Sequence, residues 1–365
     1  MIIRSALKKG EVTLIGLAKL LGMKFKEYPE GYTTITYDQF ETPNESRVAC
    51  ECRGVVFDEN YDIVCRGFDR FFNYGEPAAR YAGVDFRKAK IYEKLDGSLI
   101  KIWYDHKANQ WRTSTSNRIY GESQVSDHGI TFKELVYLAL NVKSDEEFNL
   151  RCEPLEKDAT HIYEVTSPYN RIVTVYSETT LWHLASRRNK TGEYLNIDGT
   201  VIGAKLPKVY ELDTIEACLK AAEELGNREE GFVLYENNIP RLKIKSTDYV
   251  RIHHIRGEDL SVGRICNLII KNEINEYLTY FPDDSHIIMP FKKGFDMFIG
   301  EVEQLYDQTK HIQDSKELAL TLKGNNLLHF VFSLRKGSKN VKEAFLRVSE
   351  PNQKEILKKY AQKAA

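Results

Sequence analysis

The chain has 365 residues, of which 42% are hydrophobic and 29% charged, and its formal net charge is -1. This composition is typical of a soluble globular protein long enough for two domains, and the charge excludes a global basic field that would hold nucleic acid. No apolar run approaches the roughly 18 residues of a membrane span, and the six cysteines form no zinc-like cluster, so we expect a cytoplasmic protein with free thiols.

The first 250 residues are predicted to consist mostly of strands. Alternating, β-branched or aromatic runs predict strands at 32–37, 51–57, 62–68, 90–103, 111–115, 161–166, 172–176, 180–185, 231–236 and 241–246. Two helices are expected among them. The first covers 131–140, where Thr131 and Glu134 have the spacing of a capping box, and the second covers 214–225 and ends at Gly226.

Beyond residue 250 the apolar residues recur with the period of an amphipathic helix. The pattern predicts helices at 260–280, 295–309, 315–322, 326–334, 341–348 and 353–361, with glycine and proline residues between them. The sequence therefore predicts an α+β domain over residues 1–250 and a smaller all-α domain over residues 251–365.

The run Lys94-Leu95-Asp96-Gly97 lies between two strand-like segments. A glycine at such a turn lets the backbone approach a phosphate closely. The pattern K-x-D-G is the signature of enzymes that attach a nucleotide to their own lysine. Four letters alone are a weak signal, so the interpretation depends on the residue types found further along the chain.

Carboxylates and lysines follow Lys94 on predicted strands: Glu164, then Glu230 before Gly231, then Lys243 and Lys245 on one face of a strand. A lysine must be neutral to attack a phosphate; neighbouring cations lower its pKa and offset charge on the leaving pyrophosphate. The carboxylates can hold Mg²⁺ or ribose hydroxyls. Each feature alone fits a solvated strand face or a turn, but their joint order favours the functional interpretation.

A second cluster lies upstream. Arg53 precedes a glycine at a strand start, and Arg70 precedes Phe71 and Phe72 after a predicted turn. A guanidinium fork suits a phosphate, and a phenylalanine can stack on a base. A core position is the favoured interpretation for Phe71, whereas for Phe72 the core and the site are equally compatible with the sequence.

Taken together, these motifs resemble the RNA ligase 1 family of bacteriophage T4, the single-strand RNA ligase branch of the covalent nucleotidyltransferases. The resemblance covers residues 45–250 and rests on Glu-Cys-Arg-Gly, Arg-Phe-Phe-Asn, Lys-x-Asp-Gly-Ser-Leu, Ser-Pro-Tyr-Asn-Arg-Ile-Val (167–173), Glu-Gly-x-Val and Leu-Lys-Ile-Lys-Ser. It implies an N-terminal nucleotidyltransferase fold of ATP-grasp-like antiparallel sheets with flanking helices.

The resemblance also implies an activity. Lys94 would attack the α-phosphate of ATP to give lysyl-AMP, the AMP would pass to an RNA 5′-phosphate, and a 3′-hydroxyl would then seal the strands. The family pattern matches Lys243 and Lys245, which are expected to act in catalysis with Lys94. The carboxylates Glu164 and Glu230 are the candidate ligands for Mg²⁺ or Mn²⁺. The family pattern assigns the nucleotide to Arg53, Arg70, Phe72, Asp96, Gly97, Glu164, Glu230, Gly231 and Val233, the last in the adenine slot.

By the same resemblance, the expected partners are ATP and single-stranded RNA or nicked tRNA, with no membrane contact, and the chain is expected to be a monomer. A role in RNA repair, in the host cytoplasm for a bacteriophage protein, is expected by analogy. The basic end of the helical domain could grip structured RNA, although a solvated helical face is the favoured interpretation.

The chain departs from the family at two places. Arg70 stands where the phage enzyme has a lysine, and the two are not equivalent donors. The phage enzyme also carries a basic residue in the strand after the nucleophile, where this chain has the hydroxyl-rich run 113–117. Arg112 is a candidate to replace that residue.

Three alternatives stay open at this point. A DNA ligase and an mRNA capping guanylyltransferase share the lysyl-nucleotide chemistry, but both favour an arginine where this chain has Leu99 and both favour an OB fold rather than a helical C-terminus. A comparison of GTP with ATP would distinguish the guanylyltransferase. The third alternative is an RNA-binding protein on an inactive ligase fold, against which the intact lysines and glutamates argue.

Overall fold

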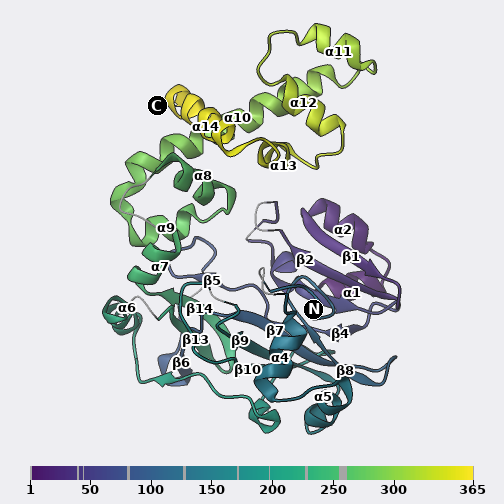
Figure 1. Ribbon diagram of the computed structural model, residues 1–365, viewed down its shortest axis with the longest axis vertical. Coiled ribbons are helices and arrows are strands. Elements are labelled where there is room, and N and C mark those ends of the chain that lie inside the picture. The colour runs from purple at the N-terminus through teal and green to yellow at the C-terminus, as the bar shows by residue number, and fades with distance from the viewer. Residues whose placement is uncertain are drawn as a thin grey trace. The chain divides into compact units, whose positions relative to one another are not determined.

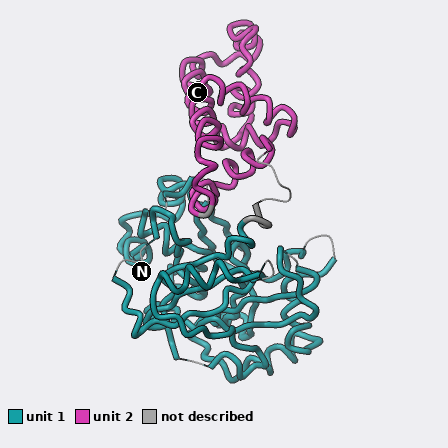
Figure 2. Tube along the Cα trace, turned by 90° about the vertical axis from the view of Figure 1, so that its left-hand side faces the viewer, with its two compact units in different colours: residues 1–253 teal, residues 254–365 magenta. Residues whose placement is uncertain are grey.

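In the computed structural model the chain divides into two compact units, residues 1–253 and 254–365 (Figure 2). The structure describes residues 2–38, 41–43, 45–79, 83–125, 129–170, 172–196, 198–226, 229–254 and 261–364. The sequence-based boundary at residue 250 falls inside helix α7 (Thr247–His254).

The first unit begins with a four-stranded antiparallel sheet covered by short helices (Figure 1). Its strands are β1 (Met23–Tyr28), β2 (Tyr32–Tyr37), β3 (Arg53–Phe57) and β4 (Ile63–Cys65), in that order across the sheet. The helices are α1 (Ile2–Lys8), α2 (Leu14–Leu20) and α3 (Arg47–Glu51). Their apolar faces pack with Ile35, Val55 and Phe57 of the sheet.

A five-stranded antiparallel sheet has the order β11-β10-β9-β7-β8. Its members are β7 (Ser98–Asp105), β8 (Gln110–Ser114), β9 (Ala159–Thr166), β10 (Thr180–Arg188) and β11 (Tyr194–Leu195). The even-numbered side chains Ile100, Ile102 and Tyr104 of β7 pack with helices α4 (Phe132–Leu140) and α5 (Asp145–Cys152). Because side chains alternate along a strand, Lys101 and Trp103 face the four-stranded sheet, where Trp103 packs on Val56.

The second five-stranded sheet has the order β12-β6-β13-β14-β5. It contains β5 (Phe72–Asn73), β6 (Ala89–Glu93), β12 (Val209–Tyr210), β13 (Gly231–Glu236) and β14 (Ile239–Lys245). One face packs against α6 (Ile215–Glu224). On the other face Tyr92, Val233 and Tyr235 join Leu99 and Ile162 in a cluster that links the two five-stranded sheets. The motifs predicted from sequence to form the site lie on strands that border this cluster.

The second unit is helical. Its helices are α8 (Val262–Ile270), α9 (Ile274–Tyr280), α10 (Ser285–Thr309), α11 (Ser315–Thr321), α12 (Leu328–Arg335), α13 (Val341–Leu346) and α14 (Glu350–Ala364), with 3₁₀ turn η3 (Pro282–Asp284). Helix α10 lies against α14, and a Cβ at Gly294 would come within 2.5 Å of the Tyr360 backbone. The glycine therefore permits the close approach of the two helices.

The α+β class and the helical C-terminal region are confirmed, as is the capping box at Thr131. Residues 172–176 form no strand, so that expectation was wrong; Arg171 beside them lies outside the described residues. The parallel pairing of β5 with β14 also departs from the expected antiparallel arrangement. In the second unit, α10 continues through Pro290 and Gly294, while the helix expected over 260–280 is divided near Asn272, whose φ is 56°.

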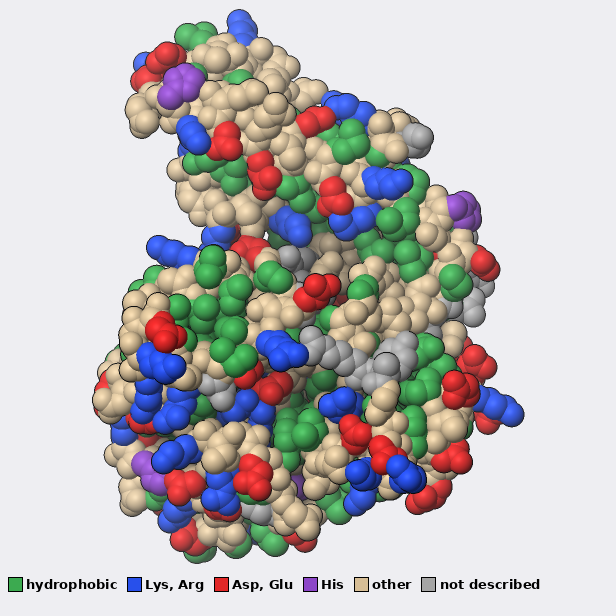
Figure 3. All heavy atoms as spheres, turned by 180° about the vertical axis from the view of Figure 1, so that it is seen from behind, with side chains coloured by type: hydrophobic (Ala, Val, Ile, Leu, Met, Phe, Trp, Pro, Cys, Tyr) green, Lys and Arg blue, Asp and Glu red, His purple; other side chains and the backbone are tan. Residues whose placement is uncertain are grey.

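The surface carries charges of both signs. On the face drawn in Figure 3, acidic and basic side chains are interspersed rather than segregated. In the part of the chain that the structure describes, no helix is long and apolar enough to cross a membrane. All six cysteines are free thiols, and five of them are buried.

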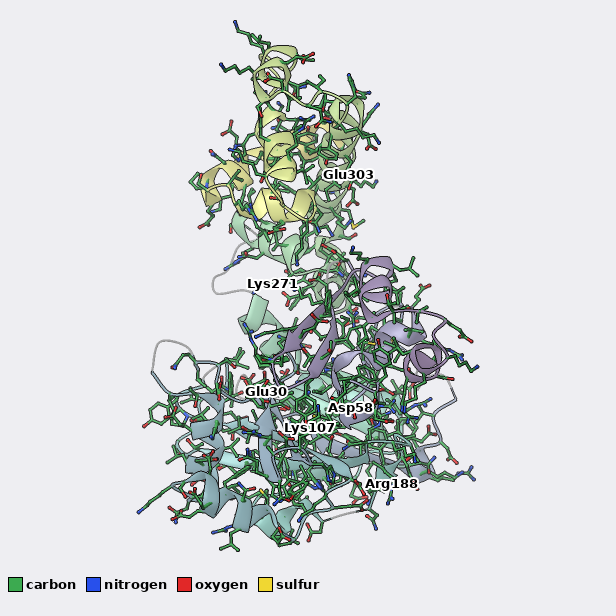
Figure 4. The ribbon with its side chains drawn as sticks, turned by 90° about the vertical axis from the view of Figure 1, so that its right-hand side faces the viewer. Glu30, Asp58, Lys107, Arg188, Lys271 and Glu303 are labelled. Carbon is green, nitrogen blue, oxygen red and sulfur yellow. The ribbon has the colours of Figure 1, made fainter. Side chains whose placement is uncertain are left out.

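Loop contacts also join the sheets of the first unit. Lys107, in the turn between β7 and β8, donates from Nζ to the carbonyl of Glu30 in the β1–β2 turn at 3.1 Å (Figure 4). The same ammonium pairs with Glu59. The β1–β2 hairpin is thereby tied to the five-stranded sheet that contains β7 and β8.

Two buried histidines should make the first unit acid-sensitive. The Ser186 hydroxyl lies 2.8 Å from Nδ1 of His161 and 3.0 Å from Nε2 of His183, and burial lowers the pKa of both imidazoles to about 4. The ordinary histidine pKa is about 6.5, so the unfolded chain binds protons that the folded chain excludes as the pH falls below 6.5. We expect the free energy of unfolding to fall by about 3 kcal/mol for each histidine as the pH decreases from 6.5 to about 4. Above pH 6.5 the two histidines should not affect it.

Urea unfolding followed by tryptophan fluorescence measures this effect, because all three tryptophans (Trp103, Trp111 and Trp182) lie in the first unit. His161→Gln should reduce the loss between pH 7.5 and 5, whereas replacement of the exposed His311 by Gln should leave it unchanged. An equal pH dependence in wild type and His161→Gln would contradict the assignment.

Candidate active site

Lys94 follows β6 and is held by the next strand of its sheet. Its N–H donates to the Gly231 carbonyl at 2.8 Å, and its Nζ lies 2.6 Å from Oε1 of Glu230. The Lys94 side chain is 20% exposed, whereas that of Glu230 is 6% exposed. Gly231 has φ 137°, and a Cβ there would lie 2.1 Å from the Ile244 carbonyl oxygen, so only glycine fits this close strand approach.

The turn after Lys94 rests directly on β9. A Cβ at Gly97 would lie 2.4 Å from the Val165 carbonyl oxygen and 3.1 Å from Cγ of Glu164. Gly97 therefore lets the turn after Lys94 approach the strand that carries Glu164, whereas the close approach to a phosphate expected of this glycine stays a prediction. Burial raises the pKa of Glu164 to about 8, although Lys94 opposes the shift. Burial also raises the pKa of Glu230, again opposed by Lys94.

Asp96 is buried, and both of its carboxylate oxygens accept hydrogen bonds from the protein. Its Oδ2 accepts hydrogen bonds from the N–H groups of Val173 (2.8 Å) and Thr174 (2.6 Å), and its Oδ1 accepts from the Tyr249 hydroxyl (2.8 Å). The carboxylate is 2% exposed. These contacts favour a positioning role for Asp96 in place of the nucleotide contact expected from the motif.

Asp96→Ala should destabilise the first unit by about 3 kcal/mol, because two buried N–H groups and a hydroxyl would lose their acceptor. Tyr249→Phe removes one of the three donors and should cost about 1 kcal/mol. Urea unfolding by tryptophan fluorescence gives both values. If Asp96→Ala unfolds at the same urea concentration as wild type, these hydrogen bonds do not stabilise the turn.

Two of the predicted cations meet on one aromatic ring. Lys243 Nζ lies 4.9 Å from the ring centre of Phe71, and the Arg53 guanidinium carbon lies 5.8 Å from it. Burial, with the nearby charges of Arg53 and Lys94, lowers the pKa of Lys243 to about 7. Lys245 is paired with Gly231 in the β13–β14 register, and its Nζ lies 5.8 Å above the ring of Tyr249.

Phe71, favoured from sequence as a core residue, is therefore the ring that lies among the cations. Phe72 is 7% exposed and pairs with Leu242 where β5 meets β14. Arg70 stacks over Phe72 at 5.1 Å and over Tyr37 at 4.2 Å, and its Nη1 is buried without a hydrogen-bond partner. The sequence could not show which of the two phenylalanines faces the cations. The strand β5 is only two residues long, too short for an alternating pattern to assign its side chains to a face.

Val233 lies in the apolar cluster between the five-stranded sheets, together with Phe71, Tyr92 and Leu99. This cluster gives the site an apolar wall suited to a base. Arg112, by contrast, is committed elsewhere: its Nε lies 3.3 Å from Asp105 and its guanidinium stacks on Tyr120 at 4.9 Å. The structure thus does not bring Arg112 to the other predicted residues.

Glu164 and Glu230 are the candidate metal ligands. In the described part of the chain no group of three or more metal-ligating residues could hold an ion by itself. Mg²⁺ is nonetheless commonly bound by one or two carboxylates together with substrate phosphates. Two carboxylates with raised pKa values, close to Lys94, fit such a site because a bound cation would favour their ionised forms.

Comparison with known proteins decides the family. Residues 51–250 match the RNA ligase family. The chain belongs to this family. The resemblance to the phage T4 branch is confirmed, and the matched span contains Arg53, Lys94, Glu164, Glu230 and both lysines of β14.

Individual relatives match different shares of the chain. A protein of Autographa californica nuclear polyhedrosis virus, provisionally named a bifunctional polynucleotide kinase/RNA ligase, is 36% identical over 94% of this chain and 52% of its own length. The chain thus spans about half of that relative. An RNA ligase of Rhodothermus phage RM378 is 23% identical over 77% of the chain and 84% of its own length. RNA ligase 1 of bacteriophage TS2126 is 29% identical over 46% of the chain and 42% of its own length.

Proposed function

We propose that this chain is an ATP-dependent RNA ligase that joins RNA 5′-phosphate and 3′-hydroxyl ends. The observation that carries the proposal is the 2.6 Å pair of Lys94 Nζ with Glu230, bordered by Glu164 and by the cations Lys243 and Arg53. A nucleophilic amine beside carboxylates that can accept its proton, with cations nearby for phosphate oxygens, is what lysine adenylylation requires.

In the first step, the Lys94 ammonium loses a proton to a neighbouring carboxylate and its nitrogen attacks the α-phosphorus of ATP. An N–P bond forms, the bond to the β-phosphate oxygen breaks, and pyrophosphate leaves with charge offset by Lys243, Lys245 and Arg53. A divalent cation, Mg²⁺ or Mn²⁺, held by Glu164 and Glu230 would neutralise charge on the phosphates. The base would pack on the Val233 wall.

In the later steps an RNA 5′-phosphate oxygen attacks the lysyl-AMP phosphorus and Lys94 leaves. The 3′-hydroxyl then attacks the RNA 5′-phosphate and AMP leaves.

We propose residues 1–250 as the adenylyltransferase domain and the helical residues 251–365 as the part that contributes RNA specificity. Single-stranded RNA or nicked tRNA is the proposed substrate, and a monomer the proposed state.

Incubation of the chain with ATP labelled at the α-phosphate, and separately with labelled GTP, tests the proposal on a denaturing gel with Mg²⁺ present. Covalent label from ATP, and its transfer to 5′-phosphorylated RNA on addition of that RNA, is the expected result. Label from GTP alone would favour a capping guanylyltransferase. Transfer to nicked DNA but not to RNA would favour a DNA ligase, and no label from either nucleotide would favour the binding-only alternative.

A further inference from the structure

Lys101 is a fully buried lysine that the proposed chemistry does not use. Its side chain lies on β7, is 1% exposed and faces away from the α4–α5 core. In the described part of the chain no carboxylate pairs with it. An isolated ammonium is costly to bury, so its retention in a core position calls for a specific contact.

Lys101 makes hydrogen bonds with the backbone of β3 and with the side chain of Cys65. Its Nζ donates to the carbonyl oxygen of Gly54. Gly54 has φ 68°, and a Cβ there would lie 2.0 Å from the Ser116 carbonyl oxygen, so this glycine occupies a left-handed conformation in a confined position. The residue before it is Arg53. A donor fixed to the Gly54 carbonyl therefore restrains the Gly54–Val55 peptide, one residue beyond Arg53.

The surroundings leave space for the lysine but supply no counter-charge. A Cβ at Gly67 would lie 3.2 Å from Cδ of Lys101, so the absence of a side chain there accommodates the lysine stem. Across the strand pair, Lys101 faces Ser114, whose Oγ lies 3.7 Å from Sγ of Cys65. Burial lowers the pKa of Lys101, an effect that Cys65 opposes and Arg53 reinforces. The neighbouring positive charge is thus Arg53 itself.

We infer that Lys101 is a positioning residue for ATP binding, which acts through Gly54 to hold Arg53 in place for the phosphates. The inference rests on the proposed function, because it assigns Arg53 to the triphosphate. On the adjacent strand β8, Ser114 lies directly opposite Lys101.

The test compares Lys101→Met with Lys101→Arg in the full chain. We expect Lys101→Met to raise the KM for ATP in Lys94 adenylylation about tenfold with a smaller change in kcat, and Lys101→Arg to restore part of the loss. The matched control is Ile102→Val, at the next residue, equally buried but facing the opposite core. It should leave the KM for ATP unchanged.

A double-mutant cycle with Arg53→Ala separates positioning from general destabilisation. If Lys101 acts through Arg53, Lys101→Met should change the ATP dissociation constant less than twofold in the Arg53→Ala background. The same tenfold loss in both backgrounds, or a wild-type KM in Lys101→Met, would overturn the inference. Should Lys101→Met fail to fold, Lys101→Arg takes its place. A KM for ATP in Lys101→Arg as high as that of Arg53→Ala would also overturn the inference. Failure of the wild type to form lysyl-AMP would instead refute the proposed function.

Discussion

Lys94→Ala is expected to abolish covalent labelling by ATP, with a loss of at least about 1,000-fold, because Lys94 supplies the amine that lies 2.6 Å from Glu230. The same variant should still seal RNA whose 5′-end is already adenylylated, since that step needs the phosphate-binding groups but not the nucleophile. The two activities together distinguish a lost nucleophile from a lost fold. Both are measured by gel, with labelled ATP and with pre-adenylylated RNA.

The control for this variant is Lys90→Ala, an exposed lysine on the same strand β6. It should keep both activities. If Lys94→Ala still takes up label, the nucleophile is a different residue. If it seals pre-adenylylated RNA no better than buffer, the substitution has damaged more than the nucleophile, and melting of the variant would then show whether the first unit still folds.

Lys243 should give the second largest effect and a characteristic pH dependence. Its pKa is about 7 in the free protein, so the side chain is charged below that pH and neutral above it. Because the charged form attracts the triphosphate, the affinity of the free protein for ATP should weaken as the pH rises through 7. Lys243→Met should reduce adenylylation about 100-fold and remove this pH dependence.

Lys243→Arg keeps a charge at all these pH values, so its ATP affinity should vary little between pH 6 and 8. Arg241→Met, two residues earlier on β14, is the matched control and should retain the wild-type profile. Equilibrium titration with ATP across this pH range makes the measurement. A wild-type profile in Lys243→Arg would mean that another group, such as Glu164 with its pKa of about 8, governs the dependence.

The strand-borne part of the site could be predicted because each residue sits in an alternating run. Lys243 and Lys245 lie two residues apart in such a run. A close approach of two backbones requires a glycine, and Gly97 and Gly231 lie at such approaches. The residue that contacts the Lys94 amine could not be predicted in this way. Sequence order suggested that cations would surround the amine, whereas the nearest charge is the carboxylate of Glu230 at 2.6 Å. Only the pairing of β6 with β13 fixes that distance.

The errors have similar causes. The roles of Phe71 and Phe72 depend on a two-residue strand that pairs in parallel with β14, which is about 170 residues away along the chain, and local alternation cannot encode such a contact. Pro290 was expected to lie between two helices, but α10 contains it as an internal residue and packs on α14. The short helices α1 and α2 have seven residues each, too few for a period to stand out.

The thiol distribution offers a practical way to observe the site in solution. Five cysteines are buried and only Cys50 is half-buried, so a thiol-reactive dye at limiting dose should modify this one position. Cys50 is three residues from Arg53, and its carbonyl accepts the Arg70 N–H at 2.7 Å. Cys50 is therefore a native attachment point for a fluorescent reporter of nucleotide binding. The other cysteines need not be replaced before labelling.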